Sequence, residues 1–163
     1  TTPDGRTLYG GRGIEPDIRV TGNTINALKG RINESAFFFV RQLVAGKIAG
    51  LDYFKTEKQS FRQIVAPGEF QTSDKLLDAF RAFVTADKAS GLSAENVNSQ
   101  PDYVKMRIRE ELATASLSSE AGIQVLLETD PQVLKAVESM PQAVKLAETV
   151  TYEPTSKRQI AQS

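Results

Sequence analysis

Apolar residues recur at helical spacing along most of the chain after Asn33, and this periodicity restricts the fold more than any other feature of the sequence. The clearest example follows Ser73, where large apolar side chains occupy positions i, i+1, i+4, i+7 and i+8. Ser73 is a good N-cap, and Asp74 suits the positive end of the helix dipole. The pattern predicts an amphipathic helix that ends near Asp87. Its apolar face consists of Leu76, Leu77, Phe80, Phe83 and Val84.

A second apolar helix is expected from Asn33, which is a good N-cap, to about Ile48. Gly30 argues against a long helix before that point, so residues 24–32 are expected to form a short helix or a connector. Phe39 lies at the edge of the apolar face, and Phe38 points nearly the other way. The face itself consists of Phe37, Val40, Leu43, Val44 and Ile48.

Capping residues and prolines mark the starts of the remaining helices. Ser93 is expected to cap a short turn, and Pro101 suits the first position of a helix, where its missing N–H needs no partner. Pro131 and Pro141 are each expected to begin a short helix for the same reason. The expected apolar stripes are Val104, Ile108, Leu112 and Ala115 after Pro101, and Ile123, Leu126 and Leu127 in the helix after positions 118 and 119.

The first residues of the chain indicate β structure instead. Thr7 to Tyr9 and Asp17 to Thr21 are β-capable, and Pro3-Asp4-Gly5 before them is a turn signal. Two strands alone are marginally stable in water. We therefore expect a mainly α fold of about five or six short to medium helices, preceded by a short β-like stub. The expected divisions are a stub at 1–22 that ends another domain, a helical domain at 23–150 and a flexible tail at 151–163.

The composition excludes several kinds of active site. The 163 residues include no Cys and no His, so a thiol nucleophile, a His-supported triad or a His/Cys zinc site cannot be built from them. Twenty basic and twenty acidic residues cancel, so no net field draws the chain to nucleic acid. We expect no metal, no small-molecule cofactor and no nucleic-acid partner, and we assign no catalytic residue within this chain.

Three features that could indicate sites favour structural roles. Ser118 and Ser119 precede an apolar run, which favours a helix cap over a nucleophile paired with a lysine. The run Gly10-Gly11-Arg12-Gly13 lacks the spacing of a phosphate-binding loop. The charges from Lys105 to Glu111 are typical of a solvated helix surface.

The motif Thr2-Pro3-Asp4-Gly5-Arg6, followed by Gly13-Ile14-Glu15-Pro16-Asp17, resembles a signature of the carboxyl-terminal processing, or tail-specific, proteases. Residues 36–51 and 126–133 are similar, less specifically, to the helical extension of some bacterial members. The resemblance implies a serine endopeptidase with a lysine as general base, a PDZ-like domain and an exported, periplasmic or extracytoplasmic location. The catalytic residues of such an enzyme would precede Thr1.

On this resemblance, the chain is the C-terminal helical segment of the protease, and its own role is scaffolding or dimerisation. The expected partners are a polypeptide substrate, reached through the upstream core, and a second copy in a homodimer. A free-standing α-helical protein-interaction module without catalytic activity is the alternative. A self-contained hydrolase that uses carboxylates or lysine is a third, less favoured class.

Phe37, Phe38 and Phe39 are the candidate partner-contact residues. Three consecutive aromatic side chains cannot all face one side of a helix. Phe38 is therefore available to a partner chain, to the protease core, or to a second helical layer of the same domain.

Overall fold

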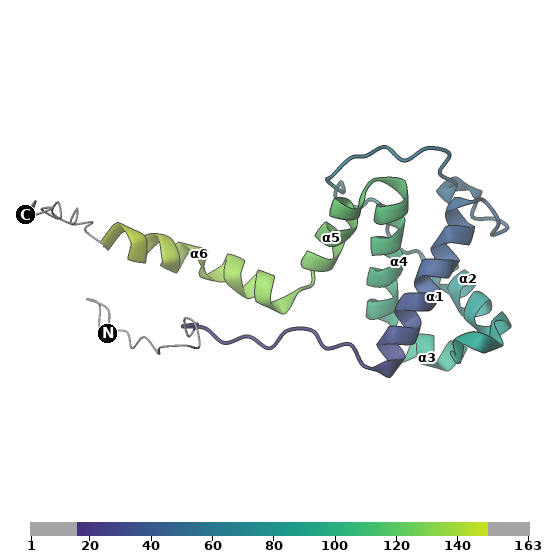
Figure 1. Ribbon diagram of the computed structural model, residues 1–163, viewed down its shortest axis with the longest axis horizontal. Helices are drawn as coiled ribbons and strands as arrows, with labels where there is room; N and C mark the ends of the chain where they lie inside the picture. The colour runs from purple at the N-terminus through teal and green to yellow at the C-terminus, as the bar shows by residue number, and fades with distance from the viewer. Residues whose placement is uncertain (1–15, 150–163) are drawn as a thin grey trace, which may run out of the picture.

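The computed structural model describes residues 16–149, which form a helical body and a projecting helical arm (Figure 1). Six α-helices and no strand occur within these residues, so the mainly α class is confirmed; the predicted strand Thr7 to Tyr9 lies outside them. Asp17 to Thr21 forms no strand. The helices are α1 (Ala27–Val44), α2 (Asp74–Ala86), α3 (Ala94–Asn98), α4 (Pro101–Ser116), α5 (Ser119–Leu127) and α6 (Pro131–Thr149), with 3₁₀ turns η1 (Asp52–Phe54) and η2 (Lys88–Ser90).

The core lies where α1, α2 and α4 pack against one another. Phe39 of α1 contacts Phe80 of α2 edge to face, with the ring centroids 5.3 Å apart. Val104, Ile108 and Leu112 of α4 are fully buried, which confirms this part of the predicted stripe. Each such side chain contributes about 1.5–3 kcal/mol to the free energy of unfolding.

The predicted starts of the middle helices are confirmed. The Ser73 hydroxyl accepts a hydrogen bond from the N–H of Leu76 at 3.2 Å and so caps α2. Ser93 caps α3 through a reciprocal capping box, and Pro101 is the first residue of α4. The side-chain oxygens of Ser73 and Ser93 satisfy backbone N–H groups that have no partner within the helix.

The first helix begins earlier than the sequence predicts. Asn26, and not Asn33, is the N-cap, and its side chain accepts a hydrogen bond from the N–H of Lys29 at 2.9 Å. Gly30 lies on the exposed face of α1, where the packed helix tolerates its small cost. The helix ends at Val44, before the predicted Ile48, because Gly46 takes a φ of +70° and terminates it.

The buried face of α1 also differs from the predicted face. Phe39 and Ile32 are fully buried, whereas Phe37 is 42% exposed. Ser35 and Ala36 are also buried, and Phe37, one residue further along the helix, lies toward the exposed side. The predicted face is confirmed at Val40 and Leu43, which are buried, and was wrong at Phe37, because it omitted the preceding turn that carries Ile32.

A long connection from η1 to α2 crosses the α4–α5 turn. The N–H of Ser60 donates to the carbonyl of Ser116 at 3.0 Å, and the N–H of Val65 donates to Gln124 Oε1 at 3.0 Å. Phe61, in this connection, has a φ of +56° and is 71% exposed. Bulky residues rarely adopt this left-handed conformation.

Helix α5 packs against α4 through small residues. Ser118 caps α5, as predicted, by accepting a hydrogen bond from the N–H of Ala121 at 3.2 Å. Gly122 is buried against Thr114 of α4. The predicted apolar face of this helix, Ile123, Leu126 and Leu127, was wrong in part because small residues form the contact with α4. The buried residues of α5 are Ala121, Gly122 and Val125, whereas Ile123 and Leu127 are 53% and 43% exposed.

Helix α6 is one helix, whereas the sequence predicts two. Its first turn is capped by Asp130, whose carboxylate accepts hydrogen bonds from the N–H groups of Gln132 at 2.8 Å and Val133 at 3.0 Å. Pro141 lies inside the helix, where it removes one backbone hydrogen bond without ending the helix. None of the residues of α6 is buried, and the helix extends away from the body beside residues 16–26 (Figure 1).

Candidate functional site

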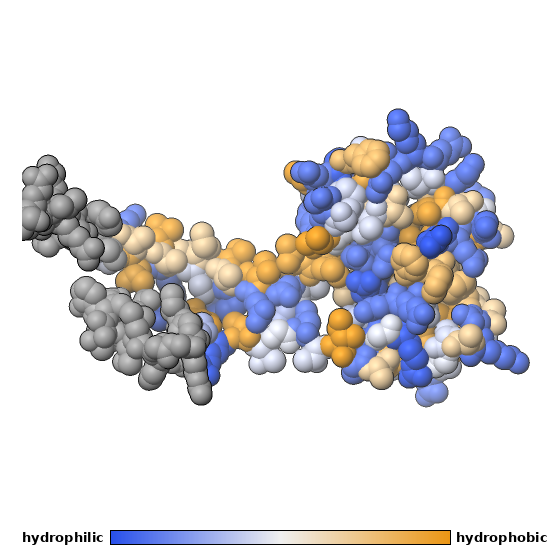
Figure 2. Space-filling model, viewed as in Figure 1, coloured by the Kyte–Doolittle hydropathy of each residue, from blue (hydrophilic) through white to orange (hydrophobic). Residues whose placement is uncertain are grey.

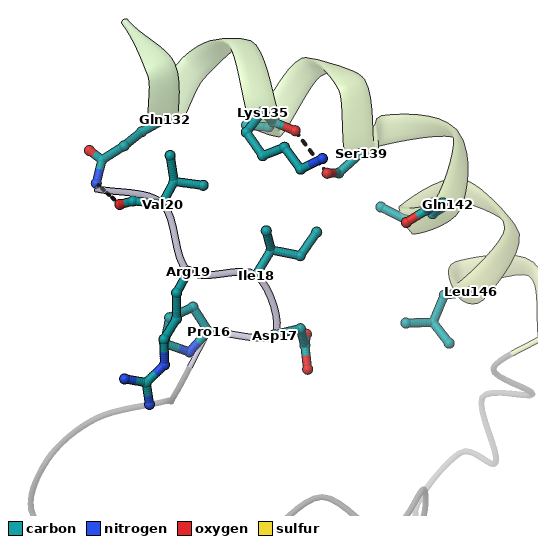
Figure 3. A pocket seen from close by; sticks show the side chains of 12 residues that line it. Pro16, Asp17, Ile18, Arg19, Val20, Gln132, Lys135, Ser139, Gln142 and Leu146 are labelled. Carbon is teal, nitrogen blue, oxygen red and sulfur yellow. Dashed lines mark hydrogen bonds between the residues drawn. The ribbon is translucent and has the colours of Figure 1, made fainter. Parts of the chain in front are cut away.

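An open groove of about 920 Å³ lies between α6 and residues 16–20 (Figure 3). The side-chain amide of Gln132 donates to the carbonyl of Val20 at 3.1 Å and fixes one end of the groove. Ile18 points from the extended segment toward α6, as Figure 3 shows. The groove joins Pro16 and Asp17, which end the protease-like signature, to the C-terminal helix.

The groove contains a serine and a lysine, but their hydrogen bonds are structural. The hydroxyl of Ser139 donates to the backbone carbonyl of Lys135 at 2.8 Å. The ammonium of Lys135 forms an ion pair with Glu138 at 3.0 Å. The serine proton is therefore directed to a backbone carbonyl and not to an amine that could accept it.

A second surface of α6 is apolar and exposed. Val137, Met140 and Val144 are 65%, 57% and 50% exposed. At 100° per residue these side chains share one face, and Lys135 and Lys145 point away from it. We call this face the α6 stripe; it consists of Val133, Ala136, Val137, Met140, Ala143, Val144 and Ala147. Ala136 and Ala143 form its edge toward the groove, which they also line.

Hydrophobic side chains follow the arm and continue onto the adjoining end of α5 on the face shown in Figure 2. The exposed Ile123 and Leu127 of α5 lie four residues apart and so share one side of that helix.

The three candidate phenylalanines separate into a core residue and a surface pair. Phe39 packs between Phe80 and Phe83, so its prediction as a partner contact was wrong. Phe37 and Phe38 remain 42% and 49% exposed, with their rings edge to face at 5.3 Å. Among the described residues, no second helical layer covers Phe38.

The charged run on α4 is more buried than the predicted solvated surface. The side chains of Arg107, Glu110 and Glu111 are only 14%, 13% and 14% exposed. Arg107 Nη1 lies 3.0 Å from Glu110 Oε2, and Nη2 lies 2.8 Å from Glu111 Oε1. The spacing of the charges was visible in the sequence, but their burial depends on how the helices pack.

Two carboxylates in this cluster share one guanidinium. Burial raises the pKa of Glu110 to about 7; the charge of Arg107 opposes this shift and that of Glu111 adds to it. Burial also raises the pKa of Glu111, again opposed by Arg107. Glu110 Oε2 and Arg107 Nε lack hydrogen-bond partners, so the ion pair compensates this burial only in part.

Within residues 16–149, no three His, Cys, Asp or Glu side chains are grouped so that they could hold a metal ion. No helix in the same range is long and apolar enough to span a membrane. Family models, curated proteins and solved structures give no match to this chain.

Proposed function

We propose that this chain is the C-terminal helical segment of a carboxyl-terminal processing serine endopeptidase, in which it serves as a scaffold or dimerisation element. The observation that carries the proposal is the pair of motifs at residues 2–6 and 13–17, which combines several residue types at fixed spacing. In this proposal, the protease is exported, and a Ser-Lys pair in its upstream core cleaves polypeptides.

The exposed apolar surfaces support a scaffolding role. Phe37 and Phe38 form an aromatic pair on the outer face of α1, and Arg41 lies over the Phe37 ring at 5.4 Å from its centroid. Aromatic residues and arginine are enriched where proteins contact one another. This face suits contact with the protease core, whereas the α6 stripe lies on a separate arm.

The alternative is a free-standing helical interaction module. The exposed α6 stripe favours the interaction module and the scaffold equally, because both functions need apolar surface that the chain itself does not cover. The two functions differ in whether a catalytic core accompanies the helices.

The deciding experiment begins with the complete reading frame that encodes this chain. We expect it to encode a PDZ-like region and a Ser-Lys pair upstream of Thr1. The full-length protein should then cleave a polypeptide with an unstructured C-terminus, and replacement of that upstream serine by alanine should abolish cleavage. A frame without these elements would overturn the protease assignment and leave the interaction module.

A further inference from the structure

We infer that the α6 stripe binds the α6 stripe of a second copy of this chain in antiparallel orientation. This inference deepens the proposed scaffold, on which its biological purpose rests, by naming the partner. It starts from the repeat within the stripe. Val133, Met140 and Ala147 lie seven residues apart, as do Ala136 and Ala143, and Val137 and Val144. A seven-residue apolar repeat is the pattern that packs one helix along another.

The order of residues in the stripe favours an antiparallel pair. With Met140 of each copy at the two-fold axis, Val133 faces Ala147 of the second copy. By the same symmetry Val137 faces Ala143, and Val144 faces Ala136. Each valine then meets an alanine, so large and small side chains fill the interface evenly. A parallel pair would place valine against valine and alanine against alanine.

Charge and backbone geometry are compatible with this pairing. Lys135, Glu138 and Lys145 lie on the side of α6 away from the stripe, so the pair buries none of these charges. Pro141 projects about 100° from Met140, so its ring does not enter the contact. Antiparallel helices also place opposite ends of their dipoles together.

The contact area sets the expected strength. A helix of 19 residues is about 28 Å long, and a contact strip about 10 Å wide gives roughly 600 Å² over both copies. This is about half of the smallest stable interfaces. We therefore expect a weak dimer, with a dissociation constant of about 0.1–1 mM.

Neighbouring substitutions on opposite faces of α6 test the interface. The 163-residue chain, Val144→Glu and the matched control Lys145→Glu are compared by sedimentation equilibrium over a wide concentration range, with circular dichroism to check helicity. Val144→Glu should weaken association by more than about tenfold, because it places a carboxylate in the apolar contact. Lys145→Glu should associate like the unchanged chain. A chain that stays monomeric throughout, or equal association of both variants, would overturn the inference.

Disulfide trapping tests the orientation, because the chain has no cysteine of its own. Met140→Cys should form a covalent dimer under mild oxidation, whereas Ala147→Cys alone should not. A mixture of Val133→Cys and Ala147→Cys should form a covalent heterodimer. Self-linking of Ala147→Cys as efficient as that of Met140→Cys would indicate a parallel pair and refute the proposed register. These results do not depend on peptidase activity, so the dimer and the protease assignment fail separately.

Discussion

At the scale of single residues, Glu110 couples the stability of the fold to pH. Its pKa lies above the ordinary value of 4.5, at about 7, because the folded protein buries it. Folding therefore favours the protonated acid, and this contribution is complete below pH 4.5 and is lost as the pH rises through 7. We expect the free energy of unfolding to fall by about 1–2 kcal/mol across this interval, after allowance for solvent screening.

The substitution Glu110→Gln isolates this effect, because glutamine keeps the shape of the side chain and does not ionise. The variant should lose the part of the pH dependence between about pH 5 and pH 8 that Glu110 contributes, and keep the part due to Glu111, whose pKa is also raised. It should exceed the unchanged chain in stability at the higher pH. Urea unfolding at several pH values measures it. Glu138→Gln, on a side chain that is 69% exposed, is the control and should leave the pH dependence unaltered. A Glu110→Gln profile parallel to that of the unchanged chain would contradict the assignment.

At the scale of elements, the close approach of α4 and α5 depends on Gly122. A Cβ added there would lie 1.9 Å from Thr114 Oγ1 and 3.3 Å from the carbonyl oxygen of Glu110. Gly122→Ala should therefore lower the free energy of unfolding by about 1–3 kcal/mol. Gly30→Ala is the matched control because a Cβ at Gly30 meets nothing within 4 Å, so this variant should gain about 0.5–1 kcal/mol. Urea unfolding of both variants measures these changes. A Gly122→Ala variant more stable than the unchanged chain would contradict the prediction and show that α4 and α5 separate easily.

The elements also show what the sequence could predict. Caps at Ser73, Ser93 and Ser118 were predictable because a cap is a local interaction between a side chain and the next turn. The start of α1 was not predictable from the sequence. The helix tolerates Gly30 because this residue lies on the exposed face of a helix that is held by packing. Pro141 likewise resembled a helix start, because local sequence cannot show that a helix continues through a proline.

The candidate surfaces were predictable only in part. The cluster Phe37, Phe38 and Phe39 could be recognised in the sequence. Which two of the three are exposed could not, because this depends on the packing of Phe39 against α2. The apolar residues of α6 were also visible. The exposure of these residues could not be predicted, because an amphipathic helix has the same sequence pattern whether its apolar face is covered or exposed to solvent.

At the scale of the whole molecule, α6 should be less stable than the body, because it contributes no buried residue. Amide hydrogen exchange at increasing protein concentration tests this. In dilute protein, α6 should exchange much faster than α1 and α4. Protection of α6 should rise with concentration as dimers form, while that of α1 and α4 stays constant. Equal protection of α6 and α1 in dilute protein would contradict this hierarchy.

The hydrogen bond between Gln132 and Val20 joins residues 112 positions apart. Pro16 lines the groove beside α6, and Thr149 is the last residue of that helix. A mechanical force that pulls these two points apart would therefore act on the arm before it acts on the body. It would peel the extended segment away from α6 at low tension, while the packed helices α1 to α5 kept their shape.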